Sequence, residues 1–223
     1  MGFLDMFDWS RLLHWVLRAG SVLLCIIIHE MSHGLAALAL GDPTAKRQHR
    51  LSLNPLRHLD PFGLLMMLFV GFGWAKPVPV DMRYFKHPKS GMALTALAGP
   101  LSNFLLAFLL LVFTGWLMTM QVTDFLVGLV SFLASTALLS IGLGVFNLIP
   151  FPPLDGSKIV FSLLSDEGYR RVLRYERYGS LLLFALVWAG VLGRPLSAAI
   201  DAAYNALFPI AQGGFALVKN LFY

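Results

Sequence analysis

The chain has 223 residues, of which 57% are hydrophobic and only 13% are charged, and its mean hydropathy is +0.72. Soluble domains carry roughly 25% charged residues, so this composition excludes an ordinary soluble enzyme and predicts a polytopic membrane protein. The net charge of +5 then indicates basic loops on one side of a bilayer rather than a surface for nucleic acid.

Four apolar stretches are long enough to cross a bilayer as helices, which takes about 20 residues. We predict spans at 17–40, 92–120, 125–149 and 178–196. The apolar run at 62–74 is too short for an upright span and contains three glycines, which favours a re-entrant segment. The tail at 197–223 is apolar but contains Pro209, Gly213 and Gly214, and we expect an interfacial helix or a weak fifth span there.

The basic residues gather in the loops at 45–60, 76–89 and 150–177, whereas the turn at 121–124 has no Lys or Arg. If the 62–74 segment returns to the side that it entered, all three basic loops lie on one side. The positive-inside rule makes that side cytoplasmic and places the N-terminus outside. The longest polar loop is under about 30 residues, too short to fold alone, so we expect a single membrane-embedded domain over 1–223.

The first predicted span contains an H-E-x-x-H motif formed by His29, Glu30 and His33. Histidines four residues apart project from one face of a helix and can bind one metal ion, and Glu30 lies where a general base for an activated water is needed. Ionisable groups are costly within a membrane, which favours a functional site. The alternative is a buried polar cluster that stabilises helix packing.

Hydrolytic zinc sites use three protein ligands and keep one position open. Asp155 is the best third ligand, because three prolines between 150 and 153 break the preceding helix, and Gly156 permits a sharp bend. Asp155 is alternatively a turn or capping residue, since Asp-Gly is a common turn pair. Asp60, in a loop before Pro61, is the rival ligand.

These motifs resemble those of the site-2 proteases, which are intramembrane zinc metalloproteases. The resemblance rests on HEMSH at 29–33, NPLRHLDPFG at 54–63, AGPLSN at 98–103 and NLIPFPPLDG at 147–156, with GWAKPVPV at 73–80 also similar. It implies one zinc ion bound by His29, His33 and Asp155, with Glu30 activating water. It also implies cleavage of a transmembrane segment of another protein, usually after a first cut, by a compact form without PDZ or CBS domains.

A helical substrate hides its carbonyl groups in hydrogen bonds and must unwind before attack. Unwound backbone in lipid needs partners, and the segment at 74–80 is a candidate to supply them. Pro77 and Pro79 have no N–H group, so in an extended hairpin the N–H groups of Lys76, Val78 and Val80 would form a one-sided edge to which a substrate strand can add.

Other polar residues near the motifs have two interpretations. Asn103 and Asn147 either bind substrate backbone or an oxyanion, or make the interhelical hydrogen bonds that are common for membrane asparagines. Cys25 lies one turn before His29 and either approaches the metal or is a small buried residue. We expect the histidines in or near loops and span ends not to be ligands: His14, His49, His58 and His87.

The sequence therefore predicts an all-α polytopic membrane protein with four to five transmembrane helices, a re-entrant segment and a short extended hairpin. We expect a zinc-dependent intramembrane endopeptidase in a prokaryotic cell membrane, with its site nearer the cytoplasmic side and a transmembrane protein as substrate. One alternative is a membrane metal transporter or sensor, although such a protein does not need a general base such as Glu30. A catalytically idle scaffold is the other alternative.

Overall fold

Helices make up nearly all of the regular structure in the computed structural model, which describes residues 9–60 and 76–222. The all-α expectation is therefore confirmed for the described residues. The five long helices are α1 (Trp9–Ala39), α4 (Pro88–Leu117), α5 (Asp124–Asn147), α7 (Asp166–Trp188) and α8 (Gly193–Phe222). The short elements are α2 (Thr44–Arg47), α6 (Asp155–Phe161) and the 3-10 turns η2 (Pro55–Arg57) and η3 (Met82–Tyr84).

Local sequence explains where several of these helices begin. Pro88 starts α4 at a position where a missing N–H group costs nothing. The Thr123 side chain caps α5 by accepting a hydrogen bond from the Leu126 N–H at 3.2 Å, and Ser165 caps α7 in the same way through the Gly168 N–H. The apolar stretches therefore have defined N-terminal boundaries.

Among residues 9–60 and 76–222, three helices are long and apolar enough to cross a membrane: Arg11–Ala39 within α1, α4 and α5. They correspond to the first three predicted spans. The prediction of one continuous span at 178–196 is wrong, because Tyr178–Trp188 and Gly193–Gln212 meet at 90°. Gly190, with a φ of 70°, has the left-handed conformation that ends helices. The bent pair brings the number of candidate spans to four if it counts as one.

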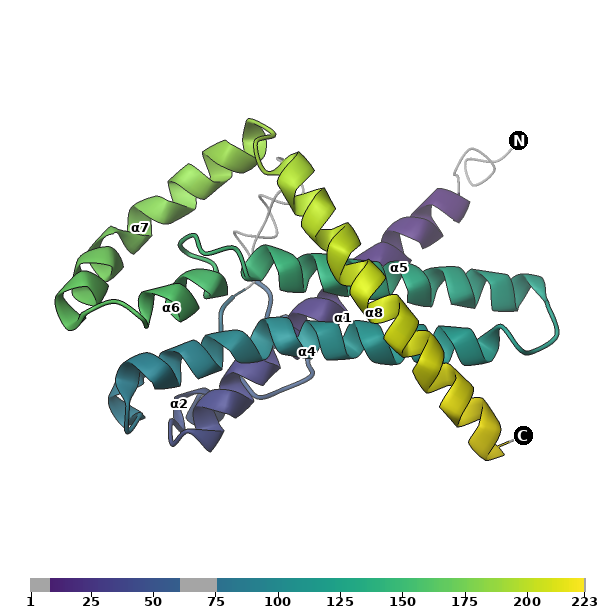
Figure 1. Cartoon of the computed structure of the whole chain (residues 1–223), viewed down its shortest axis with the longest axis horizontal. Helices are drawn as coiled ribbons and strands as arrows, with labels where there is room; N and C mark the ends of the chain where they lie inside the picture. Colours follow the sequence, from purple (N-terminus) through teal and green to yellow (C-terminus); the bar gives the residue numbers. More distant parts are fainter. Residues whose placement is uncertain (1–8, 61–75, 223) are drawn as a thin grey trace.

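The C-terminal tail is part of α8, which continues through Pro209 to Phe222. Pro209 therefore does not interrupt the helix of the tail. Helix α8 crosses over α4 and α5 (Figure 1) and shares a core with them, and this packing stabilises the helix on both sides of the proline. The buried residues of that core are Ala107, Leu111, Ala137, Ile141 and Ala211.

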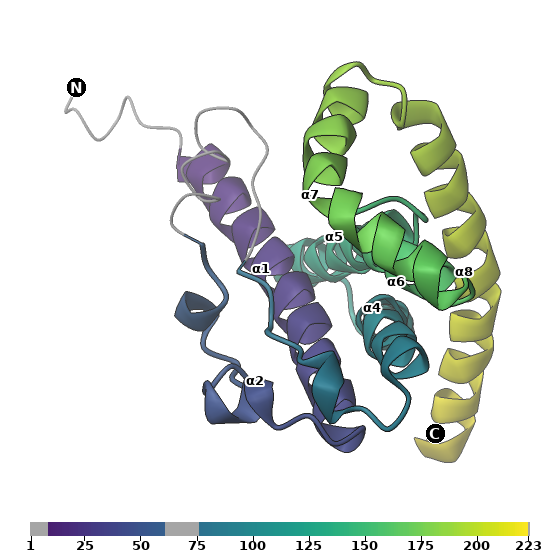
Figure 2. The ribbon, with the colours of Figure 1, turned by 90° about the vertical axis from the view of Figure 1, so that its left-hand side faces the viewer.

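Helix α4 lies in the middle of the bundle, in contact with α1, α5, α6 and α8 (Figure 2). Polar side chains join the three spanning helices: the Ser21 and Thr136 hydroxyls are 2.7 Å apart, and the Ser140 hydroxyl donates to the Asn103 carbonyl at 2.8 Å. Buried hydrogen bonds of this kind set how membrane helices pack. The first of these bonds joins α1 to α5, and the second joins α5 to α4.

The predicted re-entrant segment at 62–74 lies outside the described residues. Residues 76–80 have no regular secondary structure, so the expected extended hairpin stays a prediction. This segment returns to the C-terminal half of α1, where Val78 is buried.

Candidate metal centre

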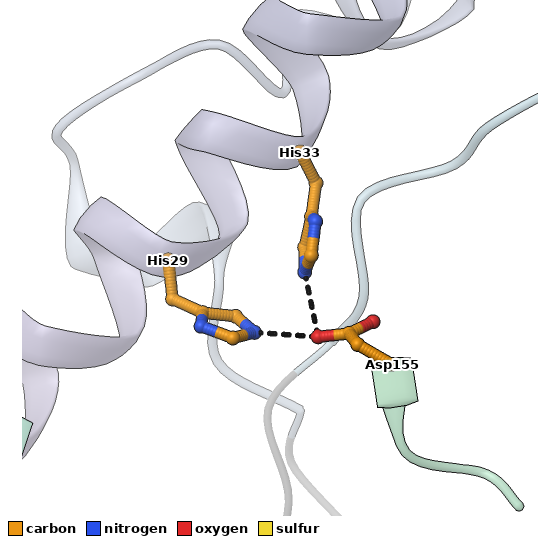
Figure 3. A group of neighbouring side chains, drawn as sticks. All are labelled: His29, His33 and Asp155. Atoms are coloured by element: carbon orange, nitrogen blue, oxygen red, sulfur yellow. Dashed lines mark hydrogen bonds and ion pairs between the residues drawn. The ribbon is translucent and has the colours of Figure 1, made fainter. Parts of the chain in front are cut away.

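Three side chains from distant parts of the sequence meet beside α1 (Figure 3). His29 and His33 lie on one face of that helix, and Asp155 is the first residue of α6. Asp155 Oδ2 is 3.0 Å from His29 Nε2 and 3.1 Å from His33 Nε2. All three residues are buried, and one potential ligand atom from each lies within 4.8 Å of the others. In the part of the chain that the structure describes, this is the only such group, and Asp60 is not a member of it.

Two glycines allow the surrounding backbone to approach this group. A Cβ at Gly99 of α4 would lie 2.5 Å from His33 Nε2 and 2.7 Å from His29 Cε1. Both imidazoles therefore pack directly against the α4 backbone at this glycine. A Cβ at Gly156 would lie 2.6 Å from the Ile149 carbonyl oxygen. Gly156 is inside α6 rather than at the sharp bend that we expected, and its role is to let α6 pack against the end of α5.

Hydrogen bonds fix the orientation of the His33 ring and the charge of the Asp155 carboxylate. His33 Nδ1 donates to the Thr95 carbonyl at 2.7 Å, an arrangement that orients Nε2 toward a metal. His29 Nδ1 is buried and has no hydrogen-bond partner among the described residues. Burial alone would raise the pKa of Asp155, but its hydrogen bonds with His29 and His33 hold that pKa well below its ordinary value. The carboxylate is therefore ionised, as a metal ligand must be.

Glu30 and the three residues above line a cavity of about 270 Å³. Glu30 Oε2 accepts a hydrogen bond from the Val78 N–H at 2.8 Å, and its other carboxylate oxygen has no partner among the described residues. The remaining wall is partly apolar and partly polar: Pro77, Val78, Val80, Met92, Thr95, Ala96, Asn147, Pro153 and Lys158.

The structure separates the residues that we expected to contact substrate. Val78, Val80 and Asn147 line the cavity, whereas Asn103 is fully buried outside it, and its amide atoms have no partner among the described residues. We predicted that the N–H groups of Lys76, Val78 and Val80 are free to bind a substrate strand, and this is wrong for two of them. The Lys76 N–H donates to the His58 carbonyl at 2.8 Å, and the Val78 N–H donates to Glu30. Buried N–H groups require partners. Of these three N–H groups, that of Val80 alone has no partner in the part of the chain that the structure describes.

Sequence reasoning missed three residues in or beside the site. Thr95 lies one turn before Gly99, a spacing that places both on one helix face. Lys158 Nζ lies 3.8 Å from Asp155 Oδ1 at a spacing of three residues, a signal that becomes visible once Asp155 starts a helix. Arg50 is also buried near the site, and no local pattern distinguishes it from the other basic loop residues.

Cys25, the other residue that we considered near the metal, and His58, which we expected not to be a ligand, both bond elsewhere. Cys25 is buried, and its thiol donates to the Thr136 carbonyl of α5, which agrees with its interpretation as a small buried residue. His58 Nε2 donates to the Ser52 carbonyl at 2.6 Å and holds the loop between α2 and η2. Neither residue belongs to the group around Asp155.

Comparison with known proteins identifies the family. The model of peptidase family M50 matches residues 114–190, which include Asp155. YwhC of Bacillus subtilis is 40% identical over 170 residues, which cover 74% of this chain and 77% of the relative. The chain belongs to peptidase family M50. Rip2 of Mycolicibacterium smegmatis is 28% identical over 81% of this chain and 70% of its own length. Zinc metalloprotease MJ0392 of Methanocaldococcus jannaschii is 26% identical over 70% of this chain and 37% of its own length. No solved structure matches the chain.

As a member of family M50, the site-2 protease family, the protein is a zinc metalloprotease with apolar helices that suit a multi-pass membrane protein. The residues present fit zinc. Two imidazoles and one carboxylate are a donor set that catalytic zinc sites use, and their nitrogen and oxygen atoms converge on one buried point. The hydrogen bond from His33 to the Thr95 carbonyl is the outer support that zinc-binding histidines commonly have.

Proposed function

We propose that the protein is a zinc-dependent endopeptidase that cleaves a transmembrane segment of another membrane protein. The observation that carries this proposal is that Asp155 meets His29 and His33 next to Glu30. The two histidines and Glu30 belong to a helix long enough to span a membrane. In this proposal the three buried residues hold one zinc ion. Glu30 is the general base.

The chain's own groups divide the work of peptide hydrolysis. Bound zinc supplies Lewis-acid polarisation and makes water more acidic. Glu30 takes the water proton with the carboxylate oxygen that does not bind the Val78 N–H and returns the proton to the leaving amine. Val78 holds the other oxygen of Glu30 through its N–H. In this proposal Asp155 contributes its carboxylate as the third zinc ligand, and His29 Nε2 and His33 Nε2, which face that carboxylate, contribute the other two.

The cavity supports a substrate with apolar side chains and locally unwound backbone. Val78, Val80, Met92 and Ala96 provide apolar surface next to the proposed ligands. Unwound backbone leaves N–H and C=O groups that lipid cannot satisfy. The Val80 N–H, which has no partner among the described residues, is the donor that we assign to the substrate.

We also propose one membrane-embedded domain over residues 1–223, oriented with the basic loops in the cytoplasm of a prokaryotic cell. The proposed site lies near the loops at 45–60 and 76–89, which follow α1 and contain eight of the Lys and Arg residues. The positive-inside rule then places the site nearer the cytoplasmic face. Labelling of single cysteines introduced into these loops and into the turn at 121–124 tests this orientation.

The test of the function compares wild type with Glu30→Gln in lipid at matched zinc occupancy. A panel of single-span proteins is the substrate, and mass spectrometry locates the cuts. We expect cleavage within the span by wild type and a loss of about 10²- to 10⁴-fold in the variant, the usual contribution of a general base. If wild type and Glu30→Gln both hold zinc and neither cuts any substrate, the proposal fails and zinc flux across vesicles becomes the next measurement.

A further inference from the structure

Arg50 is a buried cation without an acidic partner among the described residues. Its side chain lies in the loop after α2, and the residue is only 7% exposed. Its Nη2 donates to the carbonyl oxygens of Lys76 at 2.6 Å and of Pro77 at 3.2 Å. Burying a charge is costly unless it makes strong hydrogen bonds, so these two carbonyls are the reason for its position.

One of these carbonyls belongs to the peptide group that reaches Glu30. The Pro77 C=O and the Val78 N–H are the two ends of a single peptide unit, which is trans. Arg50 binds the oxygen end, and Glu30 Oε2 accepts from the N–H end at 2.8 Å. A peptide unit is planar and rigid, so the orientation that satisfies Arg50 also directs the N–H at Glu30. A cation on the carbonyl polarises the group and strengthens the bond from its N–H.

The surrounding contacts keep this peptide group from moving away. The Val78 side chain packs at Gly34, where a Cβ would lie 3.1 Å from Val78 Cγ1. At the other end of the segment, the fully buried Asp42 accepts the Asp81 N–H at 2.7 Å. Buried charged side chains therefore hold both ends of residues 76–81.

We propose that Arg50 is a positioning residue for Glu30 and acts through the Pro77–Val78 peptide group. By holding one carboxylate oxygen of Glu30 on the Val78 N–H, Arg50 keeps the other oxygen directed into the cavity. This inference rests on the proposed function, because Glu30 matters only if the site hydrolyses peptides. The competing explanation is that Arg50 only ties two loops together.

The experiment uses the full chain in lipid, loaded with zinc, and the variants Arg50→Met, Arg50→Lys, Val78→Pro and the double variant Arg50→Met/Val78→Pro. Arg57→Met is the matched control, because Arg57 is an exposed arginine of the same loop that also donates to a backbone carbonyl, that of His49. The readouts are zinc per chain and kcat and KM on one cleaved substrate. Hydrogen exchange at the Val78 amide is measured, with and without zinc, in the proteins that keep Val78.

We expect Arg50→Met to keep its zinc and its KM, to exchange the Val78 amide faster, and to lose about 10- to 100-fold in kcat, as small misplacements of catalytic groups do. Arg50→Lys should recover part of kcat, since its ammonium can still donate to the Pro77 carbonyl. The double variant should lose no more than Val78→Pro alone, because both changes break one link. Arg57→Met should match wild type.

Unchanged exchange at Val78 in Arg50→Met, losses that add in the double variant, or an equal loss in Arg57→Met would each overturn the inference. If Arg50→Met does not fold, Arg50→Lys combined with Val78→Pro provides the same cycle. Failure of the proposed function is distinguishable: wild type would then cleave no substrate, whereas the exchange comparison needs no cleavage and still decides whether Arg50 holds the peptide group.

Discussion

Gly99→Ala tests the close contact between α4 and the two histidines. The added methyl group would lie 2.5 Å from His33 Nε2 and 2.7 Å from His29 Cε1. Carbon atoms in contact prefer about 3.5–4.0 Å, so the rings or the helix must move by about 1 Å. Neither ring can move freely, because His33 is tied to the Thr95 carbonyl and both are buried.

The expected cost has two parts. Overpacking a filled site costs about 1–3 kcal/mol, and the better helix propensity of Ala offsets about 1 kcal/mol of it. The net loss of stability is therefore small, roughly 0–2 kcal/mol. The larger effect is on zinc, because displacing a group that orients metal ligands typically weakens binding by about 10- to 100-fold. Cleavage should fall in proportion to zinc occupancy at limiting metal.

The assay is zinc competition against a chromophoric chelator, with thermal unfolding as the stability measurement. Gly128→Ala is the matched control, since it makes the same change in the spanning helix α5 with no atom within 4 Å of the new methyl group. We expect the control to bind zinc like wild type. If Gly99→Ala binds zinc and cleaves substrate like wild type, the two imidazoles can accommodate the added methyl group without displacement, and the reasoning is refuted.

Four further outcomes are expected. A strong chelator should abolish cleavage, and added zinc should restore it. Asp155→Asn removes an anionic ligand and should lower the zinc content of the purified protein; full zinc in that variant would exclude Asp155 as a ligand. Gly156→Ala should also lower zinc content, because its Cβ would push α6 from the Ile149 carbonyl; an unchanged content would contradict this packing. Thr136→Val removes the hydrogen bond to Ser21 and should cost about 0.6–1.7 kcal/mol of stability in thermal unfolding while zinc binding stays intact; a loss of zinc would link this contact to the site.

Several features of this protein follow from the sequence by itself, because they depend on local spacing. The positions of His29 and His33 on one face need only a helix, and an apolar stretch without internal proline is enough to predict α1. The same hydropathy argument located α4 and α5 to within a few residues. Asp155 could be named as a third ligand because few carboxylates follow directly after a span.

Tertiary structure alone decided the features that depend on contacts between distant segments. The right angle between α7 and α8 requires Gly190 to turn the chain, and hydropathy averages over such a turn. Whether the Val78 N–H faces a substrate or Glu30 depends on how residues 76–81 return to α1, which no local pattern encodes. Arg50 looks like any loop arginine until packing buries it against the Pro77 carbonyl, because burial is a property of the whole fold and not of neighbouring residues.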